Sequence, residues 1–171
     1  EFAERHGVVL SAESKFKGEI GRGTVLGHDV RLLFPTTFMN VSGESVGVVA
    51  RFYKIEPTEV LVAYDEVAFA PGKSKLKFGG GDNGHNGIRS VVAGFGNDVG
   101  FARLRIGVGH PGDPAEMTSY LTRVSMPESE WALISGSLTM DDELLGYVLE
   151  ADWQKAMTLY HSKPAPTGEA S

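Results

Sequence analysis

The sequence predicts a single-domain α/β protein with a largely parallel mixed sheet flanked by helices. Three observations lead to this fold. Residues 60–63 (VLVA) form a β-branched apolar run typical of a buried parallel strand. Strand-like and helix-like segments alternate along most of the chain, which is the order of α/β sheets. Residues 18–34 form a hairpin, which adds antiparallel strands.

Composition narrows the class of protein. The chain has 171 residues, 42% of them hydrophobic and 22% charged, as in one folded domain. We expect that domain over residues 1–163 and a flexible tail, rich in Pro, Gly and Ala, over 164–171. The absence of cysteine excludes disulfides and thiolate chemistry and fits a cytoplasmic protein. No apolar run is long enough to span a bilayer, so we expect no membrane partner.

The charge is unevenly distributed. The formal net charge of −6 argues against bulk binding to nucleic acid. Residues 73–105, however, carry six basic and two acidic side chains. This basic island suggests one localised contact with an anion, and a scatter of solvated charges fits the pattern equally well.

The first third of the chain contains helix and hairpin signals. Residues 1–6 have the pattern of a final helical turn, with Gly7 as its C-cap. The hairpin strands are expected at 18–26 and 29–34, with the turn at 27–28. After a loop, Ser42 is the expected N-cap of a helix that Pro57 stops, and its buried face comprises Val46, Val49, Ala50, Phe52 and Tyr53.

The stretch 59–92 organises the chain. Its apolar strand ends in the carboxylates Asp65 and Glu66, where α/β sheets usually place their chemistry. A Pro-Gly turn leads into the alternating segment 74–78, with both lysines on one face. The glycine-rich run 79–87 then enters a helix, expected at about 87–95. An acid, basic side chains and a glycine-rich turn into a helix suit an anionic, phosphate-bearing substrate.

The remaining chain contains a strand and at least one long helix. Residues 101–108 predict a strand with Arg103 and Arg105 on one side. An irregular excursion is expected at 113–126, followed by a helix through Ile134. Residues 141–161 are expected to form one helix whose apolar stripe packs in the core: Leu144, Leu145, Val148, Leu149, Trp153, Ala156, Met157 and Tyr160.

Five ordered blocks together resemble bacterial peptidyl-tRNA hydrolase. They are PTTFMNVSG (35–43), LVAYDE (61–66), PGK (71–73), GGGDNGHNGIR (79–89) and RLRIGVGHPG (103–112). The resemblance implies that fold and hydrolysis of the ester between peptide and tRNA, which recycles tRNA from stalled translation. It implies a monomer in the cytoplasm that acts on tRNA with no metal or cofactor. A histidine is the general base in this family, and an aspartate orients it.

The resemblance assigns roles to individual residues. Asp65 matches the aspartate that supports the histidine, and Asn40 and Asn86 match asparagines that hold the ester region. Phe38 and Met39 match the pocket for the tRNA terminus. The positions that match phosphate-facing residues are Lys75, Lys77 and Arg105. Each has a structural alternative: Asp65 as a strand-end cap, Asn40 as a residue preceding a helix, and the basic residues as a solvated face.

The chain departs from the family at several positions. The family's first strand and its catalytic histidine would lie before Glu1, and His6 stands too close to the hairpin to replace that histidine. The chain is therefore expected either to lack this segment or to be a paralogue that no longer hydrolyses. Tyr64 stands where the family usually has histidine, and Asp82-Asn83 replaces a His-Gly pair.

Two further functions compete with the hydrolase. A non-catalytic RNA-binding relative would use the same basic island, and it would bind RNA in a salt-sensitive way without turnover. A nucleotide-binding enzyme using 79–87 as a phosphate loop ranks last, because no Gly-Lys-Ser/Thr follows. Of the other histidines, His85 is expected to be structural or to contact water or phosphate. No pair of them has metal-ligand spacing beside carboxylates.

Overall fold

The computed structural model describes residues 2–37, 41–66, 68–81, 85–107 and 140–162. These residues divide into two compact units. The first comprises Glu1–Val60, Phe78–Phe101 and Leu149–Ala151, and the second comprises Leu61–Lys77, Ala102–Val148 and Asp152–Ser171. None of the helices in the described ranges has the length and apolar character that crossing a bilayer requires. One domain over 1–163 remains a prediction.

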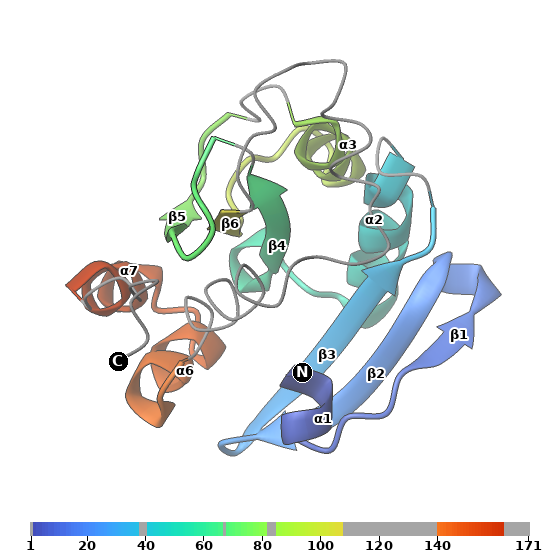
Figure 1. Cartoon of the computed structure of the whole chain (residues 1–171). Coiled ribbons are helices and arrows are strands. Elements are labelled where there is room, and N and C mark those ends of the chain that lie inside the picture. The colour runs from blue at the N-terminus through green and yellow to red at the C-terminus, as the bar shows by residue number, and fades with distance from the viewer. Residues whose placement is uncertain (1, 38–40, 67, 82–84, 108–139, 163–171) are drawn as a thin grey trace. The chain divides into compact units, whose positions relative to one another are not determined.

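An antiparallel sheet forms much of the first unit. Its strands are β1 (Ser11–Glu13), β2 (Gly18–Val25) and β3 (His28–Pro35), in that order (Figure 1). The hairpin is confirmed, but its turn is Leu26-Gly27, one residue earlier than predicted. Both turn residues have positive φ, 49° and 79°, which matches the twist of a two-residue hairpin. Leucine is not a typical turn residue, so the sequence favoured Gly27-His28 as the turn.

The short helix α1 (Phe2–Arg5) ends as the sequence predicts. Gly7 adopts φ +67°, a left-handed conformation that costs glycine little. The Val8 N–H donates to the Ala3 carbonyl at 2.8 Å, which is the long bond of a Schellman motif. The chain then turns so that Val8 is buried.

Helix α2 (Ser42–Tyr53) packs on this sheet through a core of Phe16, Ile20 and Val49. Phe16 ends a 3₁₀ turn (Ser14–Phe16), and its carbonyl accepts a 2.6 Å bond from the buried Ser45 hydroxyl. Three details of the predicted helix are wrong, and each concerns an end or an edge. Val41 takes the N-cap position in place of Ser42, the helix ends at Tyr53 before the 3₁₀ turn Pro57–Glu59, and Phe52 is 58% exposed.

Helix α3 (Asn86–Gly94) lies against α2 at a glycine contact (Figure 1). The Gly43 N–H donates to Ser90 Oγ at 2.8 Å. A Cβ on Gly43 would stand 1.8 Å from the Ser90 carbonyl oxygen, and one on Gly94 would stand 2.3 Å from the Gly43 oxygen. The two backbones therefore approach too closely for any side chain at either position.

The strands of the second sheet are β4 (Leu61–Glu66), β5 (Ser74–Phe78) and β6 (Ala102–Gly107), in the order β4-β6-β5. β4 and β6 are parallel, with Tyr64 beside Arg105. The Gly107 N–H donates to the Lys73 carbonyl and the Gly79 N–H to the Phe101 carbonyl, both at 2.9 Å. Residue numbers thus rise along one strand as they fall along the other, so β5 runs antiparallel to β6. The mixed α/β class is confirmed.

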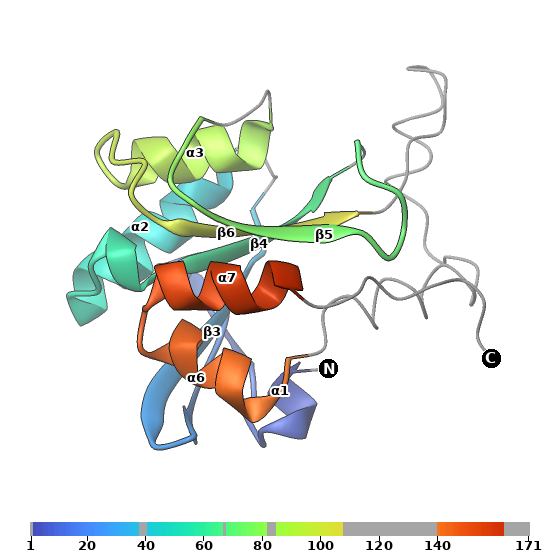
Figure 2. The same ribbon diagram turned by 90° about the vertical axis from the view of Figure 1, so that its left-hand side faces the viewer.

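Two helices follow, α6 (Asp142–Leu149) and α7 (Trp153–Ser162), where the sequence predicted one (Figure 2). The single-helix prediction is wrong because Ala151 turns left-handed at φ +57°. The Asp152 carboxylate then accepts from the Lys155 N–H at 3.3 Å and helps to start α7. The apolar stripe still supplies buried residues, as predicted: Leu144, Leu145, Trp153, Ala156 and Tyr160.

Helix α7 is bonded to β5 by side chains. The hydroxyls of Ser74 and Tyr160 are hydrogen-bonded to each other. The Leu76 backbone N–H donates to His161 Nε2 at 3.2 Å. Because that nitrogen must be unprotonated to accept, the contact requires a neutral imidazole.

This contact predicts a pH-dependent stability. Burial, followed by the charge of Lys75, lowers the pKa of His161 below its usual 6.5. The unfolded chain therefore takes up the proton more readily, and the free energy of unfolding should fall as pH drops below about 6.5. Urea unfolding of the wild type and His161→Gln at pH 7.5 and 5.5 measures this, since glutamine can accept the bond but does not titrate. An equal decrease in both proteins would contradict it.

Candidate functional site

The predicted site residues lie in different parts of the chain. Phe38, Met39 and Asn40 are outside the described residues. Asn86 belongs to the first unit, and Asp65, Lys75 and Arg105 belong to the second.

Asn86 is the first residue of α3, and its side chain is exposed. His85 precedes it as the N-cap, and its Nδ1 accepts the Ile88 N–H at 3.1 Å. This bond gives His85 a structural role, which is one of the roles that the sequence allowed. It also fixes the start of the helix, so Asn86 projects from a defined position.

Asp65 is partly buried in β4, beside Ile106 of β6. Its neighbours Tyr64 and Glu66 both interact with Arg105. Because successive side chains of a strand alternate between faces, Asp65 projects from the face opposite Arg105. The second unit thus presents an acid on one face of its sheet and the arginine on the other.

Three side chains surround Arg105. Its Nη2 forms an ion pair with Glu66 Oε1, and each of these two side chains is 16% exposed. Its guanidinium carbon lies 4.6 Å from the centre of the Phe69 ring, a cation–π contact. Burial raises the pKa of Tyr64, and the charge of Arg105 and a hydrogen bond from it partly offset that rise.

Two of the three predicted phosphate-facing residues converge on one ring. Lys75 Nζ lies 5.1 Å from the centre of Phe69, the ring that also contacts Arg105. Lys75 and Lys77 are exposed and flank the buried Leu76, so both lysines share one face as predicted. The antiparallel pairing of β5 with β6 sets Lys75 opposite Arg105, where the Glu66 carboxylate offsets their repulsion.

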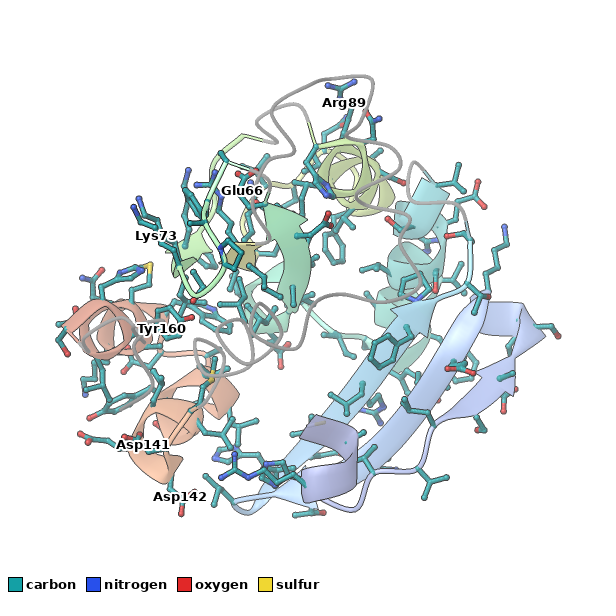
Figure 3. The ribbon with its side chains drawn as sticks, in the orientation of Figure 1. Glu66, Lys73, Arg89, Asp141, Asp142 and Tyr160 are labelled. Carbon is teal, nitrogen blue, oxygen red and sulfur yellow. The ribbon has the colours of Figure 1, made fainter. Side chains whose placement is uncertain are left out.

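The β4–β5 connection holds Phe69 in position. Gly72 adopts φ +92°, and the Lys73 N–H donates to the Ala70 carbonyl at 3.0 Å. A Cβ on Gly107 would stand 2.3 Å from the carbonyl oxygens of Ala70 and Lys73. Only glycine therefore allows the end of β6 to lie this close to the β4–β5 connection. Figure 3 shows Glu66 beside β6 and Lys73 near β5, at the two ends of the connection.

Comparison with known proteins identifies the family. The family model for peptidyl-tRNA hydrolase matches residues 1–167. The chain belongs to the peptidyl-tRNA hydrolase family. The peptidyl-tRNA hydrolase of Shewanella loihica is 46% identical over 165 residues, which are 96% of this chain and 84% of the relative. That of Yersinia enterocolitica is 46% identical over 160 residues, 94% of this chain and 81% of the relative.

Solved structures of peptidyl-tRNA hydrolases agree with this assignment. A crystal structure of a peptidyl-tRNA hydrolase with n-propanol matches with a TM-score of 0.86 and 38% identity, covering 96% of this chain and 82% of the other. The enzyme from Acinetobacter baumannii matches with a TM-score of 0.83 and 39% identity, covering 92% and 79%. The fold predicted from the sequence blocks is therefore confirmed.

Sequence reasoning missed Phe69 and the partner of Arg105. An aromatic residue two positions before the Pro-Gly turn was the available signal for Phe69. Glu66 was noted only as a strand-end carboxylate, because its contact with Arg105 depends on the register of two strands far apart in sequence.

Proposed function

We propose that this protein hydrolyses the ester bond between peptide and tRNA in peptidyl-tRNA. The observation that carries the proposal is family membership at 46% identity over 96% of the chain. The proposed mechanism is attack of water on the ester carbonyl. A general-base histidine takes the water proton, the bond to the 3′ ribose oxygen breaks, and that oxygen receives a proton as tRNA leaves.

The site residues keep their predicted roles in this proposal. Asp65 orients the histidine and stabilises its positive charge in the transition state. Asn40 and Asn86 hold the ester region, and Phe38 and Met39 line the pocket for the tRNA terminus. Backbone phosphates contact Lys75, Lys77 and Arg105, because a cluster of cations on a strand suits a polyanion.

The basic face supports the tRNA assignment. Lys75 is held beside Arg105 by a shared aromatic ring, and Lys77 lies on the same face of β5. Two cations held close together repel each other. A phosphate anion relieves this repulsion better than water does, so its binding to such a pair is more favourable. We propose that the protein acts as a monomer in the cytoplasm, where its substrate is found.

The proposal is tested by incubating the full-length protein with N-acetyl-aminoacyl-tRNA. We expect release of free tRNA, measured as loss of acid-precipitable label from the aminoacyl group. Release with a rate that saturates in substrate supports the hydrolase. Salt-sensitive tRNA binding without release would instead support the non-catalytic RNA-binding relative.

A further inference from the structure

The arginine proposed to contact phosphate is already paired with an acid of the same chain. Arg105 Nη2 bonds Glu66 Oε1, and both side chains are only 16% exposed. The ring of Phe69 covers one face of the guanidinium, 4.6 Å away. The hydrogen-bonding edge of the arginine is therefore the part that an external anion must use, and Glu66 occupies its Nη2 position.

The carboxylate and a phosphate oxygen are acceptors of one chemical class. Both form charge-assisted bonds with a guanidinium, and an arginine fork fits two oxygens of one anion best. A phosphate that uses Nη2 for this geometry competes with the Glu66 carboxylate for that nitrogen. A neutral group such as a ribose hydroxyl or a base edge cannot compensate for the lost bond between Glu66 and Arg105, because its own hydrogen bonds to arginine are weaker.

We propose that Glu66 is a specificity-determining residue that competes with the tRNA phosphate for Arg105. The inference rests on the proposed function, which assigns phosphate contact to Arg105. Glu66 lowers the affinity for tRNA, and it restricts Arg105 to ligands that carry at least one full negative charge. The Phe69 ring keeps the arginine in place while its partner changes.

The test is the isosteric variant Glu66→Gln, which keeps an oxygen that accepts the Arg105 bond but removes the charge. A charge-assisted bond becomes a neutral one, so we expect the Kd for deacylated tRNA to fall about fivefold. The slope of log Kd against log salt concentration should steepen by about one, since one further cation becomes available to phosphate. Filter binding at four salt concentrations measures both.

Two further variants separate competition from general electrostatics. In an Arg105→Gln background, Glu66→Gln should give no gain in affinity, because the contested group is gone. Glu143→Gln makes the same charge change on an exposed position of α6 and should leave the Kd unchanged. A gain that persists without Arg105, or an equal gain from Glu143→Gln, overturns the proposal.

The outcomes also separate this inference from the proposed function. Wild-type protein that releases tRNA while Glu66→Gln binds no more tightly would overturn the inference alone. Wild-type protein that neither binds nor hydrolyses the substrate would overturn the proposed function. Urea unfolding of Glu66→Gln, expected to show one cooperative transition with the same dependence on urea concentration as the wild type, verifies that the variant is folded.

Discussion

Replacing Asp65 with asparagine is expected to lower kcat for peptidyl-tRNA hydrolysis by roughly 10²- to 10⁴-fold. Asparagine has nearly the same volume, so the partly buried site in β4 should keep its packing. It cannot, however, stabilise an imidazolium, and it can hold the histidine in the wrong tautomer. Because Asp65 projects from the face opposite Arg105, the affinity for tRNA should change little.

The pH profile distinguishes this role from a structural one. Loss of a nearby carboxylate lowers the pKa of the proposed general-base histidine, so the acid limb of the kcat profile should move to lower pH. Asp142→Asn, at an exposed position that begins α6, is the matched control and should leave both kcat and the profile unchanged. A kcat for Asp65→Asn within a few-fold of wild type would refute the assignment.

Replacing Gly43 with alanine is expected to destabilise the first unit by about 3 kcal/mol or more. The new Cβ would stand 1.8 Å from the Ser90 carbonyl oxygen and 2.2 Å from its carbon. Both atoms are backbone, so no rotamer change relieves the clash, and α2 and α3 must separate. The loss exceeds the gain of roughly 1 kcal/mol that alanine brings to a helix interior. Urea unfolding measures the difference.

Gly146→Ala is the control for this prediction. Gly146 lies in α6, and nothing stands within 4 Å of a Cβ built there. The substitution should therefore be neutral or stabilise by about 0.5 to 1 kcal/mol. Gly43→Ala protein as stable as Gly146→Ala protein would show that α2 and α3 are not held together at this contact.

Local signals predicted much of this fold. The Gly7 helix end, the hairpin and the alternation of Lys75, Leu76 and Lys77 depend on short-range geometry that a few residues encode. The family blocks added the site residues, since each block is continuous in sequence. Asp65 and Arg105 could therefore be proposed as site residues without coordinates.

Features that depend on distant contacts could not be predicted in this way. The apolar stripe of 141–161 continues through the break at Ala151, because both helices bury residues in helical spacing. The pairing of Glu66 with Arg105 follows from the β4–β6 register, which no local pattern specifies. The same holds for the Gly43–Gly94 approach of two helices.

The bonds from α7 to β5 have a consequence for the order of events at the ribosome. Ser74 and Leu76 obtain partners that lie 86 and 85 residues later in the chain. While the protein is being synthesised, water must satisfy these groups until α7 leaves the exit tunnel. The strand that carries Lys75 and Lys77 therefore reaches its final hydrogen bonding only after α7 has been synthesised, and under the proposed function these lysines are not fixed in position for tRNA before that point.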